Sequence, residues 1–155
     1  MLLIRKATPA DIPALFEIRS SVRENRMSRA ELAALGITRA TLADMLAGDG
    51  RGWVAEASGQ VLAFAMANAA QATVFALFVH PDHEGRGLGR RLMAEAERWL
   101  FACGCAEIWL VTDSNREVRA NGFYRRLGWL EGGMEEDGQV RFIKRQPAVG
   151  LCAGR

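Results

Sequence analysis

The chain has 155 residues, half of them hydrophobic, a length and composition that suit one globular domain with a single packed core. Its 20 Lys and Arg nearly balance its 18 Asp and Glu, so no strong field points to nucleic acid or a membrane as a partner. Three cysteines without a Cys-x-x-Cys pair, and only two histidines, favour neither a disulfide framework nor a metal site.

The N-terminal segment lacks the features of a targeting signal. Arg5 and Lys6 interrupt the opening apolar run before it reaches the length of a signal-peptide core. No stretch of the sequence approaches the roughly 20 apolar residues that span a bilayer. We therefore expect a cytoplasmic protein with reduced cysteines.

The first third of the chain is predicted to form one strand and three helices. Residues 2–7 have the composition of a short strand, and the segment Thr8-Pro9-Ala10-Asp11 then combines an N-cap threonine, a proline at the first helical position and an acidic residue. A capping box at residues 28–31 predicts a second helix, which Gly36 would end. A third short helix is predicted over residues 38–48.

The middle of the chain carries three strand patterns. Residues 52–57 and 61–69 are predicted to form two strands, joined by the hairpin-like turn Ser58-Gly59-Gln60. Residues 72–79 form a continuous apolar run rich in β-branched and aromatic side chains, which predicts a strand buried on both faces. Pro81 would end this strand.

The last third is predicted to alternate helices and strands. From Leu88 to Cys103 apolar residues recur at helical spacing, opposite a charged face. An apolar strand over residues 106–111 leads into a capping box and a helix over residues 114–127. Residues 129–144 are predicted to form a hairpin around the turn Asp137-Gly138.

This order of elements predicts a mixed α/β fold in one domain, residues 1–146, followed by a loose tail, residues 147–155. Two strand-to-helix units lie side by side, and ligands bind at the crevice outside the carboxyl ends of such parallel strands. Most large apolar side chains fall on strand or helix stripes and are predicted to be core; they are Trp53, Phe64, Met66, Phe75, Trp99 and Trp109. Trp129 and Met134 are left open, because the last hairpin is also able to border an acceptor pocket or a dimer seam.

A glycine-rich segment, Gly85-Arg86-Gly87-Leu88-Gly89, lies between the third strand pattern and the helix that follows it. Glycines let the backbone approach a ligand, and the amides and dipole of the following helix attract anions, so the segment suits a phosphate cradle. From the glycines alone, an ordinary turn before a helix is equally favoured. A P-loop needs a Gly-Lys pair, which is missing here, and the GxGxG spacing departs from the GxGxxG dinucleotide fingerprint.

Two segments together resemble the GCN5-related N-acetyltransferase (GNAT) superfamily. Residues 84–89, EGRGLG, match the two glycines of its coenzyme A loop, [QR]xxGx[GA], but carry Glu84 where the family has Gln or Arg. Residues 115–129, NREVRANGFYRRLGW, resemble its second motif, with Asn, Ala, a Phe-Tyr pair and Gly-aromatic in order. The resemblance covers nearly the whole chain and implies a central mixed, mostly antiparallel sheet with a splayed parallel strand pair, flanked by helices.

The resemblance implies acetyl-CoA as the acyl donor. Backbone amides of residues 85–90 would hold its pyrophosphate, and backbone groups of Phe78 and Val79 would pair with its pantetheine arm like an added strand. Asn115 is predicted either to bond the pantetheine amides or only to help start a helix. Arg86, Arg90 and Arg91 are able to reach the phosphates, although a charged helix face explains them equally. The predicted cofactor-binding residues are Phe78, Val79, Gly85, Arg86, Gly87, Leu88, Gly89, Arg90 and Asn115.

The resemblance also implies a general acid. Tyr124, the only tyrosine of the chain, takes the position from which a hydroxyl would return a proton to the leaving thiolate. The alternative is a core aromatic beside Phe123 with its hydroxyl at the rim. An oxyanion would be stabilised by a backbone N–H near Phe78 or Val79.

The general base is the weakest part of this mechanism, because residues 72–79 contain no carboxylate. His80 and Glu24 are candidate bases, and Asp113 is a third, but all three are also explained as strand-end or surface groups. Deprotonation through ordered water, or entry of an already neutral amine, is equally favoured.

The sequence thus predicts an N-acetyltransferase that moves an acetyl group from acetyl-CoA to a primary amine of a small molecule, peptide or protein, by direct attack in a ternary complex. The alternative is a CoA-binding regulatory module that has lost turnover. A nucleotide- or nucleic-acid-binding protein is disfavoured by the missing Gly-Lys pair and the near-neutral charge. The acceptor pocket is expected to involve residues 19–36 and the last hairpin, and a homodimer is common in the family.

Overall fold

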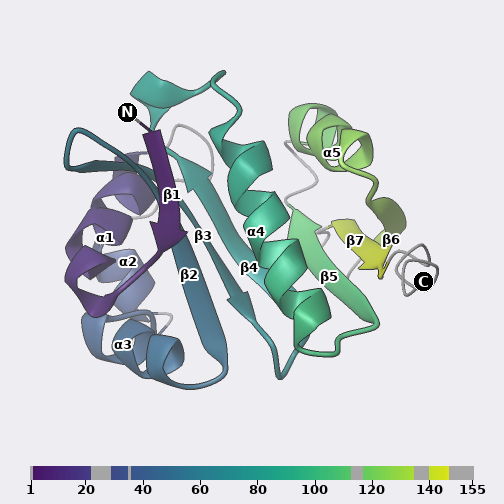
Figure 1. The fold of residues 1–155 in the computed structure, drawn as a ribbon, viewed down its shortest axis with the longest axis horizontal. Coiled ribbons are helices and arrows are strands. Elements are labelled where there is room, and N and C mark those ends of the chain that lie inside the picture. The colour runs from purple at the N-terminus through teal and green to yellow at the C-terminus, as the bar shows by residue number, and fades with distance from the viewer. Residues whose placement is uncertain (1, 22–28, 35, 113–116, 135–139, 147–155) are drawn as a thin grey trace.

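The computed structural model of the protein describes residues 2–21, 29–34, 36–112, 117–134 and 140–146 (Figure 1). Within these ranges seven strands form one sheet in the order β1-β2-β3-β4-β5-β7-β6. The strands are β1 (Leu2–Lys6), β2 (Gly50–Ala57), β3 (Gln60–Asn68), β4 (Thr73–Val79), β5 (Glu107–Thr112), β6 (Leu130–Met134) and β7 (Val140–Arg145). The α-helices are α1 (Ile12–Ser21), α2 (Arg29–Ala34), α3 (Arg39–Ala47), α4 (Leu88–Ala102) and α5 (Glu117–Arg126), and the 3-10 turns are η1 (Pro9–Asp11) and η2 (Pro81–His83). The predicted mixed α/β fold is confirmed.

Local signals in the sequence start and end the elements where they were expected. The side chain of Asp11 accepts from the backbone N–H of Thr8 at 2.8 Å, so this box begins the first helical segment. Thr38 accepts from the backbone N–H of Thr41 at 3.2 Å and caps α3. Ser58 and Gly59 both have positive φ, 53° and 78°, as the two central residues of a type I′ hairpin turn require.

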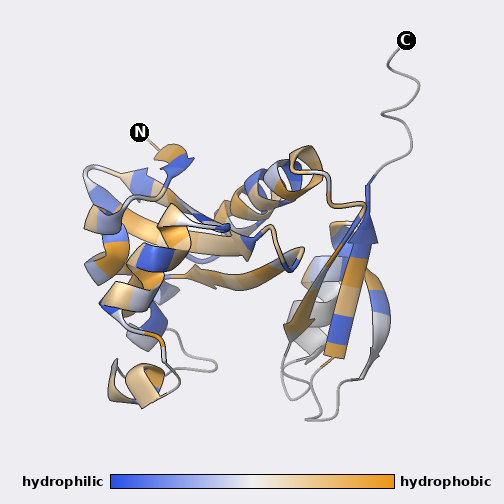
Figure 2. Cartoon of the chain, turned by 90° about the horizontal axis from the view of Figure 1, so that it is seen from below, coloured by the Kyte–Doolittle hydropathy of each residue, from blue (hydrophilic) through white to orange (hydrophobic). Residues whose placement is uncertain are grey.

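The sheet consists of two antiparallel parts that meet at one point. Strands β1 to β4 pair antiparallel in sequence order, and β5, β7 and β6 form the second antiparallel part. β4 and β5 run parallel, and Thr73 opposite Trp109 is the one register pair between them. Seen from below, β5 to β7 diverge from β1 to β4 (Figure 2). The splayed parallel pair is therefore present.

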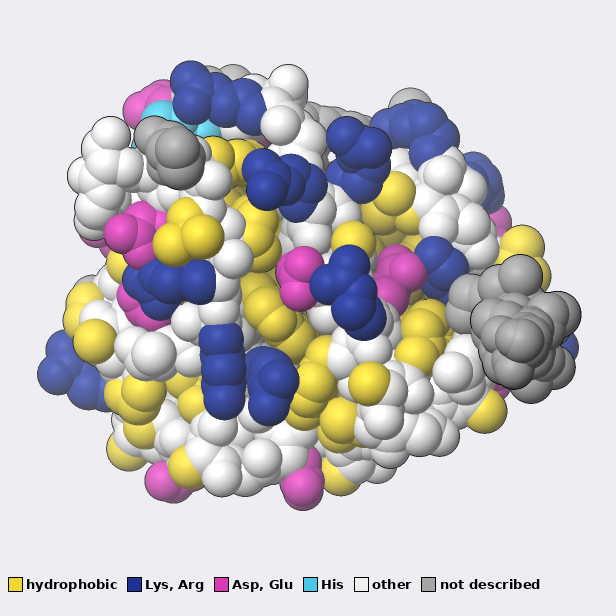
Figure 3. Space-filling model, in the orientation of Figure 1, with side chains coloured by type: hydrophobic (Ala, Val, Ile, Leu, Met, Phe, Trp, Pro, Cys, Tyr) yellow, Lys and Arg dark blue, Asp and Glu magenta, His cyan; other side chains and the backbone are white. Residues whose placement is uncertain are grey.

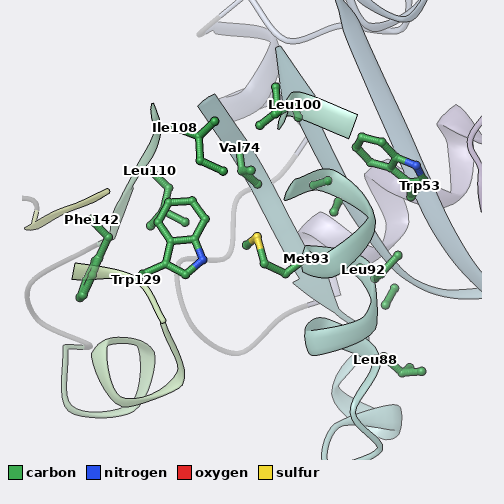
Figure 4. Close-up of a cluster of buried hydrophobic side chains, with 14 of the residues drawn as sticks. Trp53, Val74, Leu88, Leu92, Met93, Leu100, Ile108, Leu110, Trp129 and Phe142 are labelled. Carbon is green, nitrogen blue, oxygen red and sulfur yellow. The ribbon is translucent and has the colours of Figure 1, made fainter. Parts of the chain in front are cut away.

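Helices cover the sheet on opposite faces, and the strands alternate between two cores. On one face α4 packs against apolar residues that include Trp53, Ala65, Ile108 and Leu110 (Figure 4). On the other face the helices α1 to α3 pack against residues of the opposite parity, which include Val54, Phe64 and Met66. Trp53, Phe64 and Met66 are buried, as predicted.

A half-buried charged residue, Glu97, ties the second part of the sheet to α4. Glu97 of α4 accepts from the indole N–H of Trp129 at 2.8 Å and from the ammonium of Lys144 at 2.7 Å. Lys144 also donates to the carbonyl of Leu127 at 2.7 Å. Trp129 is 1% exposed, so it belongs to the core rather than to a pocket or seam. Because the backbone N–H of Trp129 also donates to the carbonyl of Tyr124, this cluster fixes the end of α5.

The predicted burial of β4 on both faces is wrong. The register between β3 and β4 shifts by one residue, because Met66 lies opposite Ala76 and Ala67 lies opposite Val74. Phe75 is the extra residue of this bulge, and its side chain is 43% exposed, whereas we predicted a core position. Residues 76–79 are half-buried, because the strand borders a cavity.

The predicted core residues Trp99 and Trp109 are half-buried. In the described part of the chain, no helix is long and apolar enough to cross a membrane. The predicted tail, residues 147–155, and the turn Asp137-Gly138 lie outside the described residues.

Candidate functional site

A cavity of about 1140 Å³ lies where β4 and β5 diverge. It exceeds the range of about 300–1,000 Å³ typical of a single small-ligand pocket. Its lining residues come from both faces of the sheet, so the cavity crosses the sheet. One half, the α4 half, includes Gly85, Gly87, Gly89, Arg90, Phe123, Tyr124, Arg126 and Leu127. The other, the α1–α3 half, includes Leu15, Phe16, Arg19, Leu32, Ile37, Leu42, Met45, Phe64 and Met66.

The N-terminus of α4 opens into the α4 half without a side-chain cap. Its N-cap is Gly87, in the left-handed conformation with a φ of 77°, and no side chain of the described residues caps it. The backbone N–H of Arg91 donates to the carbonyl of Gly87, which is the first hydrogen bond of the helix. The preceding amides of the first turn have no intrahelical partner. A 15-residue helix thus presents N–H groups without an intrahelical partner and the positive end of its dipole to the cavity, an arrangement that suits an anion.

The glycines keep this approach open. Gly85 also has a positive φ, 81°, and a Cβ there would meet nothing within 4 Å. Gly89 is different, because a Cβ at this position would lie 3.4 Å from the ring of Phe123. Gly85 and Gly87 therefore set the backbone conformation of the loop, and Gly89 allows α4 to approach α5.

Most of the predicted cofactor-binding residues line this cavity. Arg86 is exposed and is not among the lining residues, and Asn115 lies outside the described part of the chain. Arg91 does not line the cavity either. Those that line it are Phe78, Val79, Gly85, Gly87, Leu88, Gly89 and Arg90.

One edge of β4 is open toward β5. The backbone N–H of His80 donates to the carbonyl of Leu62 on the β3 side. In an antiparallel pair, backbone groups point alternately toward and away from the partner strand. His80 and Phe78 therefore point their backbone groups toward β3, and those of Leu77 and Val79 point into the gap. This alternation favours Val79, together with Leu77, over Phe78 for pairing with an extended ligand.

Tyr124 borders the α4 half from α5. Its ring packs against Phe123, Trp129 and Phe142, with centroid distances of 5.1, 6.2 and 5.6 Å. Its hydroxyl has no hydrogen-bond partner among the described residues. Burial raises the pKa of Tyr124 to about 12, so the hydroxyl stays protonated at neutral pH.

The predicted base His80 does not line the cavity. Its Nδ1 accepts from the backbone N–H of Asp82 at 3.1 Å, which assigns the proton of the neutral ring to Nε2. The other two candidates, Glu24 and Asp113, lie outside the described residues.

One lining residue was missed in the sequence, and a second was predicted only as part of the acceptor-pocket segment, residues 19–36. His83 lines the cavity, and its Nδ1 is buried without a hydrogen-bond partner among the residues that the structure describes. Arg19 of α1 lines the α1–α3 half, with its guanidinium 4.4 Å from the centre of the Phe78 ring. A signal for Arg19 existed, because it follows Leu15 by four residues and so continues the apolar stripe of α1 with a charge.

Charges of both signs are interspersed over α4 on the face that Figure 3 shows. A bound polyanion would favour a one-sided basic surface, so this pattern suits small ligands better.

Comparison with known proteins agrees with the geometry. The model of the acetyltransferase (GNAT) family matches residues 13–129. Among solved structures, PaiA N-acetyltransferase from Thermoplasma acidophilum in complex with coenzyme A is 19% identical, with a TM-score of 0.80 over 94% of this chain and 99% of that one. A phosphinothricin acetyltransferase from Sinorhizobium meliloti in complex with acetyl-CoA is 21% identical, with a TM-score of 0.71 over 93% and 88%.

A third solved structure, the ribosomal-protein-S18-alanine N-acetyltransferase from Escherichia coli, is 22% identical, with a TM-score of 0.69 over 92% of this chain and 91% of that one. At these identities the structures share the fold. The family match, in contrast, spans most of the chain, including the glycine loop and Tyr124. The chain therefore belongs to the GNAT family of acetyltransferases.

Proposed function

We propose that the protein transfers the acetyl group of acetyl-CoA to a primary amine, by direct attack while both substrates are bound. The observation that carries this proposal is the shared cavity, in which the uncapped N-terminus of α4 lies beside the open edge of β4. An anion site next to an unpaired strand edge suits a ligand with a pyrophosphate and an amide-bearing arm.

The donor is proposed to fill the α4 half. Its pyrophosphate would accept from the first amides of α4, residues 88–90, with Arg90 nearby. Its pantetheine arm would run along β4 and pair with the backbone of Leu77 and Val79. Two structural neighbours were crystallised with coenzyme A or acetyl-CoA, and their fold is the one described above.

The chemistry requires three proton and charge adjustments. A neutral amine attacks the thioester carbonyl, so a C–N bond forms, and the C–S bond then breaks to release the CoA thiolate. The oxyanion that forms in between is proposed to accept from an unpaired N–H of β4. The nitrogen loses one proton to solvent, and the thiolate gains one.

Tyr124 is proposed to supply the hydrogen bond to the leaving sulfur. Its pKa of about 12 lies above the value of about 8.5 for a thiol, so complete transfer of its proton would be uphill by roughly 5 kcal/mol. We therefore propose that the hydroxyl of Tyr124 donates a hydrogen bond to the developing thiolate. If the thiolate takes the proton of Tyr124, a proton from solvent returns to the tyrosine in the same step.

The amine is proposed to enter without its proton. In the α1–α3 half no described lining residue is a carboxylate. His80 is omitted from this mechanism, because its Nδ1 is engaged by Asp82. Glu24 lies outside the described residues, so its role as a base stays a prediction from the sequence.

Initial rates with both substrates varied test this proposal. Direct transfer in a ternary complex predicts intersecting double-reciprocal lines in an assay of thiol release. Parallel lines would indicate an acetylated enzyme and would overturn direct attack.

A further inference from the structure

Arg126 is the last residue of α5 and lines the α4 half of the cavity. α5 lies beside the first turns of α4 (Figure 1), and a Cβ at Gly89 would lie 3.4 Å from the ring of Phe123. The residues one turn before Arg126, Gly122 and Phe123, carry no carboxylate that would pair with it. The side chain is exposed, and it has no hydrogen-bond or ion-pair partner among the residues that the structure describes. Within the described part of the chain, this guanidinium is therefore available to a ligand.

Arg90 of α4 also lines this half, but its guanidinium lies at a different place. A Cβ at Gly87, the N-cap of α4, would lie 3.6 Å from Nη2 of Arg90, so this guanidinium folds back over the uncapped end of the helix. A Cβ at Gly122 would lie 3.3 Å from Nη1 of Arg126, so that guanidinium lies along α5. The first amides of α4 and Arg90 therefore meet one group of a bound ligand, and Arg126 meets another.

We infer that Arg126 binds the 3′-phosphate on the ribose of the donor, apart from the pyrophosphate site at α4. The inference rests on the proposed function, since it needs acetyl-CoA in the α4 half. The 3′-phosphate is a monoester with a charge of about −1.5 to −2 at neutral pH, and a guanidinium binds phosphate oxygens through two parallel N–H donors. Arg126 is then the residue that distinguishes coenzyme A from dephospho-coenzyme A, which lacks only this phosphate.

Calorimetry with coenzyme A and dephospho-coenzyme A tests this assignment apart from turnover. The titrations are made at low ionic strength, where an exposed charge-assisted contact is screened least. Wild-type protein should bind coenzyme A about 10-fold tighter than dephospho-coenzyme A, as one charge-assisted contact at an exposed site predicts. Equal affinity for the two ligands would overturn the 3′-phosphate site.

Variants assign this affinity ratio to one guanidinium. Arg126→Gln should bring the ratio close to one, because it weakens the binding of coenzyme A and leaves that of dephospho-coenzyme A within about twofold. Arg126→Lys should restore part of the ratio, because the charge returns without the planar fork. Arg90→Gln should weaken both ligands by a similar factor, because both carry the pyrophosphate. If Arg126→Gln also weakens both ligands equally, Arg126 belongs to the pyrophosphate site and the inference is wrong.

Arg125→Gln is the matched control, one residue away on the same helix. Arg125 donates to the carboxylate of Glu131 at 2.5 Å and does not line the cavity, but its substitution removes the same charge from α5. This variant should keep the wild-type ratio of affinities. A fall as large as that in Arg126→Gln would mean that the ligand responds to the net charge of α5 rather than to a contact, and would overturn the inference. Each variant is first shown to keep a cooperative thermal transition.

Turnover separates this inference from the proposed function. For an amine that is acetylated, Arg126→Gln should raise the KM for acetyl-CoA and leave kcat unchanged, because the pyrophosphate and the pantetheine arm separate the 3′-phosphate from the thioester. Equal kcat/KM for acetyl-CoA and acetyl-dephospho-CoA in wild type would overturn the 3′-phosphate site and leave the acetyltransferase proposal intact. The expected affinity ratios without any acetylated amine would do the reverse.

Discussion

Thr73 lies opposite Trp109 at the one register pair between β4 and β5, and its hydroxyl donates to the carbonyl of Trp109 at 2.8 Å. The backbone N–H of Trp109 donates to the carbonyl of Ala72 at 3.0 Å. Beyond these contacts the strands diverge and the cavity begins. The two antiparallel parts of the sheet are therefore joined at Thr73 and Trp109, and the cavity lies where β4 and β5 separate beyond this junction.

We expect Thr73→Val to weaken this junction. Thr73 is 3% exposed, and valine keeps its shape but loses the hydroxyl that bonds Trp109. Loss of this buried hydrogen bond should cost about 1–2 kcal/mol in the free energy of unfolding, measured by urea titration. Thr73→Ser, which keeps the hydroxyl, is the comparison. An unchanged free energy in the valine variant would show that the backbone bonds alone hold the junction.

Gly87→Val should abolish binding of acetyl-CoA. Gly87 has a φ of 77°, which a β-branched residue adopts only under strain of roughly 1–3 kcal/mol. Relief of this strain would turn the first amides of α4 away from the anion site. Calorimetry should show no binding, or binding weakened at least about tenfold.

The control for this variant is Gly59→Val. Gly59 has nearly the same φ, 78°, with nothing within 4 Å of a Cβ, and lies in the turn between β2 and β3. It should lose similar stability and keep the affinity for acetyl-CoA. Wild-type affinity in Gly87→Val would rule out the cradle at α4.

Tyr124→Phe should separate binding from turnover. The hydroxyl has no partner among the described residues, so its removal should change stability by less than about 1 kcal/mol and leave the Kd of acetyl-CoA unchanged. If the hydroxyl stabilises the leaving thiolate, kcat should fall by about 100-fold. A kcat equal to that of wild type would remove Tyr124 from the mechanism.

The reaction rate should not fall through ionisation of Tyr124 at any pH below about 10.5. Its folded pKa of about 12 lies above the ordinary value of 10, so the donor form persists until the pH approaches 12. Initial rates should therefore rise as the acceptor ammonium loses its proton and then stay level to about pH 10.5. A fall near pH 9–10 that disappears in Tyr124→Phe would mean that the hydroxyl titrates normally.

The sequence was sufficient for most of the elements and for the glycine loop because their signals are local. Thr38, the Ser58-Gly59 turn and the glycines before Leu88 each act within a few residues of themselves. The order of elements also predicted the hairpins β2–β3 and β6–β7 and the parallel pair β4–β5, but not the pairing of β5 with β7. The residues that line the cavity and are predicted to bind the cofactor were found from the glycine loop and from the resemblance to the family.

Other features depend on distant parts of the chain. The bulge at Phe75 arises from the register between β3 and β4, and an apolar run looks the same with or without it. His80 was predicted as a candidate base and His83 was not, but His83 lines the cavity and His80 does not. The contact between the Arg19 guanidinium and the Phe78 ring depends on how α1 packs against the sheet, which the sequence does not show.

The most direct test is the amount of acetylated amine that forms from acetyl-CoA in a broad amine panel, measured by mass spectrometry beside released CoA. We predict that at least one amine is acetylated in equal amount to the CoA released, at a rate proportional to wild-type protein and strongly reduced in Tyr124→Phe. Tight binding of acetyl-CoA without any acetylated amine above the uncatalysed level would contradict it, and would identify a CoA-binding module without turnover.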